Sequence, residues 1–171
     1  MALLRETGGS GSPPGWLRPL RSNDLAQVAE VYRDAVLSQA TGLYSPEQIR
    51  AWAGHPRASE SLADALGRGF GLVSCTAADG ASIEAFALLD PLDRLSLLYC
   101  RGRSCRQGRA TALLLALQHH AACQGVRRLR TEASQLSRPL LERHGWLVEA
   151  EETAWYAGVA FQRWRMLRDL P

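Results

Sequence analysis

The stretch Leu95-Ser-Leu-Leu-Tyr-Cys-Arg-Gly-Arg-Ser-Cys-Arg-Gln-Gly-Arg-Ala-Thr111 decides the fold, because it joins three patterns in direct succession. Its first six residues are mostly apolar and predict a buried strand at 95–100. An arginine- and glycine-rich loop follows, and an apolar run then predicts a helix at 110–124, closed by Gly125. A loop that enters a helix in this way can bind phosphate, because the first N–H groups of a helix have no partner within it.

Small residues at the start of this helix favour a phosphate site. Gly108 and Ala110 leave the backbone accessible, and Arg101, Arg103, Arg106 and Arg109 add positive charge. The loop lacks the Gly-Lys-Ser/Thr of a Walker A motif and the three-glycine spacing of a dinucleotide-binding fingerprint. A solvated basic loop ahead of an ordinary helix is the alternative interpretation.

Helices and strands alternate on either side of this stretch. Ser45 and Gln48 form a predicted capping box around Pro46, and Asp79-Gly80 predicts a hairpin turn. Strands are expected at 16–20, 70–76, 82–89, 95–100, 127–132, 146–151 and 159–167, and helices at 24–39, from 46 onward, 59–66, 110–124 and 136–144. The order predicts a mixed sheet with helices on both faces.

The chain has 171 residues, which suits one domain at 16–171 after a flexible Gly/Ser/Pro-rich leader at 1–15. No apolar run approaches the roughly 20 residues that span a bilayer, and no signal-peptide pattern is present, so we expect a cytoplasmic protein without a membrane partner. Four cysteines without paired spacing predict free thiols. His119 and Cys123 share a helix face, but two ligands do not make a metal site, and none is expected.

Charge is distributed unevenly along the chain. From Arg94 to Thr131 there are eight arginines and no acidic residue, whereas the rest of the chain carries 12 arginines against 17 acids. This asymmetry predicts an anionic partner near 94–131. A nucleic acid is one such partner, but the arginines cluster beside one helix start, which favours a small phosphorylated ligand and no nucleic acid.

Cys105-Arg-Gln-Gly-Arg-Ala110 resembles the acetyl-CoA loop of the GNAT superfamily of N-acetyltransferases, written Gln/Arg-x-x-Gly-x-Gly/Ala. Glu132-Ala-Ser134 and Arg138-Pro-Leu-Leu-Glu-Arg-His-Gly-Trp146 resemble the fifth strand and following helix of that family. Tyr44-Ser-Pro-Glu-Gln-Ile-Arg-Ala-Trp52 resembles the second helix of a small single-domain bacterial branch. The resemblance covers residues 16–168 and implies an α/β (α+β) fold with a GNAT-like mixed, mostly antiparallel seven-stranded sheet.

The resemblance implies a V-shaped opening between the strands at 95–100 and 127–132. Pantetheine would lie there, and pyrophosphate would lie on the loop. The implied acetyl-CoA contacts are Leu98, Tyr99, Cys100, Cys105, Arg106, Gln107, Gly108, Arg109, Ala110 and Thr111. Arg127, Arg128 and Arg130 would serve the adenosine 3′-phosphate or form a solvated strand entrance.

Several positions depart from the family pattern: Cys105 opens the loop, and Leu88, Ser96 and Leu141 stand where relatives often have Glu, Asp and Tyr. Direct attack of an amine on the thioester needs a proton acceptor. Glu132 and Tyr99 are the catalytic candidates, with Ser96 and Ser134 also near the opening. Tyr44, Trp52, Trp155, Tyr156 and Trp164 are candidates for an acceptor pocket.

The sequence therefore predicts an acyl-CoA-dependent N-acetyltransferase that moves an acetyl group from acetyl-CoA to a primary amine of a small molecule, as a monomer or homodimer. The alternative is a catalytically weakened GNAT-fold protein that binds acyl-CoA as a sensor or regulatory module. The sequence does not identify the acceptor or the proton path.

Overall fold

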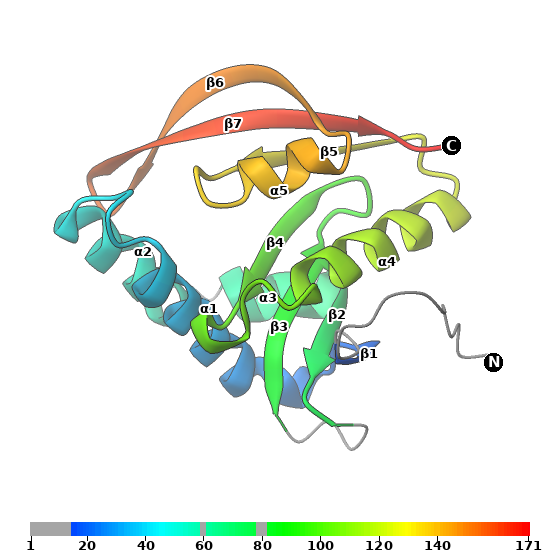
Figure 1. Ribbon diagram of the computed structural model, residues 1–171, viewed down its shortest axis with the longest axis horizontal. Helices are drawn as coiled ribbons and strands as arrows, with labels where there is room; N and C mark the ends of the chain where they lie inside the picture. Colours follow the sequence, from blue (N-terminus) through cyan, green and yellow to red (C-terminus); the bar gives the residue numbers. More distant parts are fainter. Residues whose placement is uncertain (1–14, 59–60, 78–81) are drawn as a thin grey trace.

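Two antiparallel sheets, of four and three strands, carry the fold (Figure 1). The structure is a computed structural model and describes residues 15–58, 61–77 and 82–171. The first sheet has the order β1-β2-β3-β4, with bounds Trp16–Pro19, Phe70–Cys75, Ile83–Leu89 and Leu95–Cys100. The second has the order β5-β7-β6, with bounds Arg128–Ala133, Val159–Asp169 and Leu147–Tyr156.

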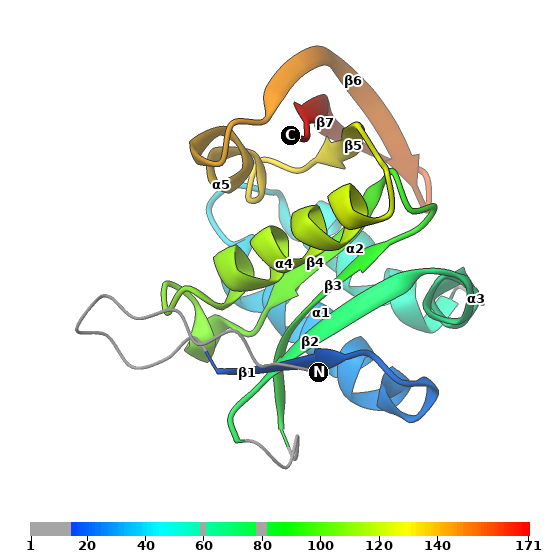
Figure 2. The same cartoon turned by 90° about the vertical axis from the view of Figure 1, so that its right-hand side faces the viewer.

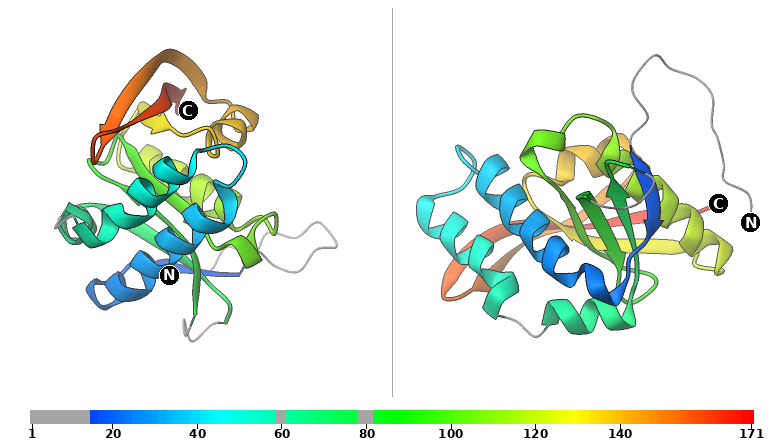
Figure 3. Two further views of the ribbon diagram at one scale, coloured as in Figure 1. Left: turned by 90° about the vertical axis from the view of Figure 1, so that its left-hand side faces the viewer. Right: turned by 90° about the horizontal axis from the view of Figure 1, so that it is seen from below.

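Helices lie on both faces of the first sheet, as the sequence predicts. The α-helices are α1 (Leu25–Gln39), α2 (Pro46–Ala58), α3 (Ser61–Arg68), α4 (Arg109–Cys123) and α5 (Arg138–Arg143), and the short 3-10 turns are η1 (Ser22–Asp24) and η2 (Gly102–Ser104). Figure 3 shows α1 and α2 on the side of the four-stranded sheet opposite to α4. The described residues form no helix that is long and apolar enough to cross a membrane.

Two apolar clusters fill the spaces between the layers. One joins α4 and α5 to strands of both sheets, with Leu113, Leu141 and Trp146 at its centre. The other joins α1 to the opposite face of β2 and β3, through Val28, Val31 and Phe86. The sheet thus separates two cores, and β4 borders both.

The predicted elements are confirmed with small shifts of their ends. Ser45 and Gln48 form the expected capping box: Ser45 N–H donates to Gln48 Oε1 at 2.9 Å, and Gln48 N–H donates to Ser45 Oγ at 3.2 Å. Both strands of the last hairpin extend beyond their predicted bounds. The turn expected at Asp79-Gly80, and the expected leader apart from Gly15, lie outside the described residues.

The seven strands do not form one continuous sheet. Among the described residues, one parallel bridge, Arg94 to Arg130, joins β4 to β5. Arg130 N–H donates to Asp93 O at 2.9 Å, and Thr131 Oγ1 donates to Leu95 O at 2.6 Å. Beyond Leu95 the strands belong to separate sheets, and β6 and β7 arch over β4 and α5 (Figures 1 and 2).

Candidate functional site

A cavity of about 740 Å³ lies where β4 and β5 part. Its walls come from both sheets and from α1, α2, α3, α4 and α5. All the residues expected to contact acetyl-CoA line this cavity except Gln107, whose Nε2 instead donates to Arg103 O at 3.1 Å. The structure therefore places the sequence motif at an opening between the sheets.

The backbone of β4 presents an unpaired edge to this cavity. Arg101 N–H donates to Glu84 O on β3 at 2.8 Å, which fixes the phase of the antiparallel ladder. Because hydrogen-bonded and non-hydrogen-bonded pairs alternate, the N–H and C=O groups of Leu98 and Cys100 point away from β3. The Cys100 carbonyl already accepts a hydrogen bond from Gln39 Nε2 at 2.7 Å.

The start of α4 forms a cradle of backbone N–H groups. Gly108 precedes the helix with φ +79°, in the left-handed region that favours glycine, and Arg106 has φ +60°. No side chain caps this helix end. The first N–H groups of α4, which begins at Arg109, therefore have no helical partner, and the helix dipole favours an anion there.

Three of the four loop arginines, which were expected to add attraction for a phosphate, also bind the protein itself. Arg101 Nε donates to Ile83 O at 3.1 Å, and Arg103 pairs with Glu84. Arg109 Nη1 donates to Ser74 Oγ at 2.9 Å, so its side chain ties α4 to β2. Among the described residues, Arg106 is the one of the four with no hydrogen bond or ion pair.

Glu84 on β3 anchors the loop, and sequence reasoning missed it. Its carboxylate is fully buried and accepts hydrogen bonds from Arg103 Nε at 3.0 Å, Ser104 Oγ at 2.6 Å and Ser82 Oγ at 2.8 Å. The Arg103 guanidinium, helped by both hydroxyls, lowers the pKa of Glu84 to about 2 against the desolvation that burial imposes. Glu84 lies 19 and 20 residues from Arg103 and Ser104, so no local spacing signals its contact with the loop.

The two catalytic candidates both line the cavity, and each has a partner. Arg94 Nε and Nη2 donate to Glu132 Oε2 at 2.9 and 2.6 Å across the junction of the two sheets. Tyr99 Oη accepts a hydrogen bond from Trp52 Nε1 at 3.2 Å. Burial raises the pKa of Tyr99 to about 12. Glu132 is therefore an ion-paired carboxylate, and Tyr99 is a neutral phenol at ordinary pH.

The other candidate positions are occupied by packing or by internal hydrogen bonds. Leu88 and Leu141 are buried, and Ser96 Oγ donates to Leu88 O at 3.2 Å. Ser134 and Ser137 share a hydrogen bond of 3.2 Å between their hydroxyls at the cavity wall. The hydroxyls of Ser96 and Ser134 are therefore both engaged in hydrogen bonds within the protein.

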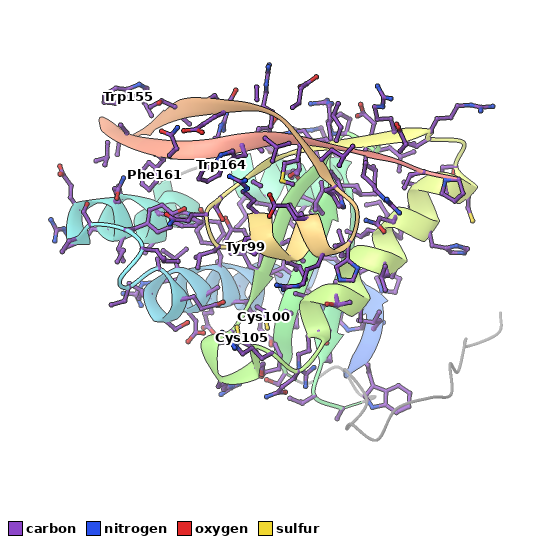
Figure 4. All side chains as sticks on the ribbon, turned by 45° about the horizontal axis from the view of Figure 1, so that its top comes forward. Tyr99, Cys100, Cys105, Trp155, Phe161 and Trp164 are labelled. Atoms are coloured by element: carbon purple, nitrogen blue, oxygen red, sulfur yellow. The ribbon has the colours of Figure 1, made fainter. Side chains whose placement is uncertain are left out.

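The aromatic residues expected around an acceptor divide into two groups. Tyr44, Trp52 and Tyr156 line the cavity, as expected. Trp155 does not, because 68% of it is exposed and it points away from the arch (Figure 4). Trp164 packs under the guanidinium of Arg138, 4.9 Å from its ring centroid, and belongs to the α4–α5 core.

The second basic cluster, formed by Arg127, Arg128 and Arg130, lies far from the cradle at the start of α4. It follows the C-terminal end of α4, and a helix of 15 residues is about 22 Å long. Arg128 pairs with Asp169 at 2.5 Å, and Arg130 pairs with Asp93 at 3.1 Å. The geometry supports the solvated strand entrance over the adenosine phosphate site.

The cysteines are free thiols. Burial raises the pKa of Cys100 to about 12 and also raises that of Cys105, so both thiols stay protonated beside the cavity. Cys123 Sγ lies 3.5 Å from His119 Nε2 on an exposed helix face. In the described part of the chain, no three His, Cys, Asp or Glu side chains gather as a metal site would require.

Solved structures with the same architecture come from several organisms. A GCN5-related N-acetyltransferase from Rhodopseudomonas palustris has a TM-score of 0.85 and 24% identity, covering 95% of this chain and all of its own. PaiA N-acetyltransferase from Thermoplasma acidophilum, solved with coenzyme A, has 0.70 and 19%, covering 90% and 98%. A phosphinothricin acetyltransferase from Sinorhizobium meliloti, solved with AcCoA, has 0.64 and 18%, covering 92% and 89%.

The sequence itself matches no protein-family model and no curated protein. The similarity to the solved structures lies instead in the arrangement of strands and helices over nearly the whole chain, at TM-scores well above 0.5. The two sheets and the helix that begins at Arg109 lie within the part of the chain that this similarity covers. The chain therefore has the fold of the GNAT N-acetyltransferases.

Proposed function

We propose that the protein binds acetyl-CoA and transfers its acetyl group to a primary amine. The observation that carries this proposal is the continuity of the cradle at Gly108 with the open edge of β4 in one cavity. Pyrophosphate is an anion that suits the N–H groups of Arg106 to Thr111, and Arg106 is the arginine left to pair with it. Pantetheine carries amides that can bond, as an added strand would, to the backbone of Leu98 and to the N–H of Cys100, whose carbonyl Gln39 already binds.

The acyl group would then lie near the point where the two sheets meet. Glu132 lies there, and its carboxylate is the group we assign to holding or receiving the proton of the amine. Strand N–H groups of β4 are placed to stabilise the oxyanion of the tetrahedral intermediate. Two of the similar structures were solved with CoA or AcCoA, which supports the choice of cosubstrate.

Thermal unfolding with and without acetyl-CoA tests the cofactor site. At 100 times its dissociation constant, a ligand that binds only the folded state adds about 2.7 kcal/mol, and we expect the midpoint to rise by several degrees. Desulfo-CoA, which retains the pyrophosphate, should stabilise comparably, whereas free pantetheine should stabilise much less. An unchanged midpoint at saturating acetyl-CoA would exclude the site.

A protein that binds acyl-CoA without turnover is the second candidate. The ion pair between Glu132 and Arg94, together with apolar Leu88 and Leu141, favours it. The two functions differ in one measurement, the release of free CoA thiol in the presence of an amine. Stabilisation by acetyl-CoA without thiol release from any amine would select the binding protein.

A further inference from the structure

The cavity continues past β4 to the side away from α4, and aromatic rings form its wall there. Side chains of β4 alternate: Leu98 and Cys100 face the α4 core, whereas Leu97 and Tyr99 face α1. The rings that line this side come from α1, α2, β4, β6, β7 and the segment before α2: Tyr32, Tyr44, Trp52, Tyr99, Tyr156 and Phe161.

These rings contact one another as a continuous surface. The centroids of Tyr32 and Tyr99 are 4.3 Å apart, and those of Tyr44 and Trp52 are 5.2 Å apart. Phe161 lies 6.2 Å from Trp52 and 5.3 Å from Tyr156, both with near-perpendicular planes. Figure 4 shows Phe161 directed toward the helices, on the side of β7 opposite to that of exposed Trp155. Such a wall favours an apolar or aromatic body.

Three of the arginines that line the cavity, apart from those at the start of α4, have acidic partners, and Arg143 on α5 lines it as well. Arg68 pairs with Asp90, Arg94 with Glu132, and Arg163 with Glu152. The Arg163 guanidinium also donates to Tyr156 Oη at 3.2 Å. To reach any of these three arginines, a carboxylate or phosphate on the acceptor would have to displace an acid, so this part of the wall disfavours an anionic acceptor.

Glu132 lies on the same face of the second sheet as Phe161. In the register of β5 against β7, Glu132 lies opposite Arg165, so the two side chains are on the same face of the sheet. Residues 161, 163 and 165 share that face of β7, because strand side chains alternate. The Glu132 carboxylate and the aromatic wall therefore line the same cavity, with Glu132 nearer to the point where the sheets join. An amine whose body contacts the rings would direct its ammonium toward this carboxylate.

We propose that the acceptor is a primary amine on an uncharged aromatic body, without a carboxylate or phosphate. This proposal rests on the acetyl-CoA function proposed above. The ammonium gives up one proton, and the neutral nitrogen attacks the thioester carbon. A C–N bond forms, the C–S bond breaks, the nitrogen gives its second proton to the departing sulfur, and the products are the amide, CoA thiol and one released proton.

A matched amine panel tests this inference. Thiol release is followed at saturating acetyl-CoA with phenethylamine, phenylalanine and ethanolamine, so that phenylalanine adds only a carboxylate and ethanolamine has a hydroxyl group in place of the ring. We expect kcat/KM for phenethylamine to exceed both others by about tenfold or more. Equal or better turnover of phenylalanine or ethanolamine overturns the proposal, as does the absence of phenethylamine turnover by a protein that acetyl-CoA stabilises. Failure of acetyl-CoA to stabilise the protein would instead overturn the proposed function.

Binding and variants give a second readout. Phenethylamine should further raise the unfolding midpoint of the CoA complex, and phenylalanine should not. Phe161→Leu should raise KM for phenethylamine about tenfold while leaving KM for acetyl-CoA unchanged. Trp155→Leu, on the neighbouring strand with an exposed ring, is the control and should change neither. If Phe161→Leu does not fold, Trp52→Phe replaces it. Equal KM values in the wall variant and the control overturn the assignment of the wall.

Discussion

Gly108 shows how much one residue determines at the cradle. Its φ of +79° costs an L-residue about 1–2 kcal/mol, and a side chain there would stand where an anion approaches the helix start. We expect Gly108→Leu to lower the unfolding free energy by about that amount and to abolish stabilisation by acetyl-CoA.

Gly125 offers a matched control at the other end of α4. It has φ +82°, and a Cβ there would meet nothing within 4 Å. Gly125→Leu should therefore lose similar stability, measured by urea unfolding, and keep its full response to acetyl-CoA. Equal responses of the two variants to acetyl-CoA would contradict the placement of the pyrophosphate.

Individual side chains were the least predictable part of the site. The run of arginines predicted an anionic partner, yet five of the eight form ion pairs with acids far away in sequence: Arg94, Arg101, Arg103, Arg128 and Arg130. A net charge over a segment does not reveal which charges the fold neutralises. Trp155 and Trp164 likewise could not be placed, because strand residues alternate and the phase was unknown.

At the scale of elements, β3 and the β4–α4 loop form one unit through Glu84. Its carboxylate has a pKa of about 2, below the ordinary value of 4.5, so the stability it contributes is present above pH 4.5 and is lost as pH falls through about 2. We expect Glu84→Gln to lower the unfolding free energy by about 3 kcal/mol at neutral pH. The difference from the unmodified protein should shrink between pH 4.5 and 2, as measured by urea unfolding.

The same variant should weaken acetyl-CoA binding, because the loop that carries the cradle loses its anchor. Glu30→Gln is the control: Glu30 contacts Arg101 at 3.4 Å, and 72% of its side chain is exposed. We expect Glu30→Gln to change stability by less than about 1 kcal/mol. Comparable losses of stability and affinity in both variants would show that Glu84 is not an anchor.

Elements were predictable where local rules determine them. The capping box at Ser45 and the glycine ahead of α4 fixed two helix starts, and the apolar run of β4 identified the buried strand. The length of the β6–β7 hairpin was underestimated, because polar and apolar residues do not alternate in the sequence Glu152-Thr-Ala-Trp-Tyr156, although the burial of these residues does. Long-range pairing is needed to keep them extended.

At the scale of the whole molecule, the junction between the sheets is narrow, and Arg94 crosses it. Arg94→Leu would leave the Glu132 carboxylate, 20% exposed, without its partner. We expect a loss of about 1–3 kcal/mol in unfolding free energy. Arg128→Leu removes a pair in which both side chains are mostly exposed and should cost less than about 1 kcal/mol. Equal losses in urea unfolding would mean that the Arg94 pair does not hold the sheets together.

The open edge of β4 has a consequence for the behaviour of the protein in a crowded solution. An unpaired strand edge is a template on which another chain can add a strand and begin to aggregate. Here β6 and β7 arch over the first sheet and α5 lies beside β4 (Figure 1), and Leu98 lines the cavity beneath this arch. We expect the arch to hinder strand addition by another folded chain, while the edge of β4 stays open to the cavity.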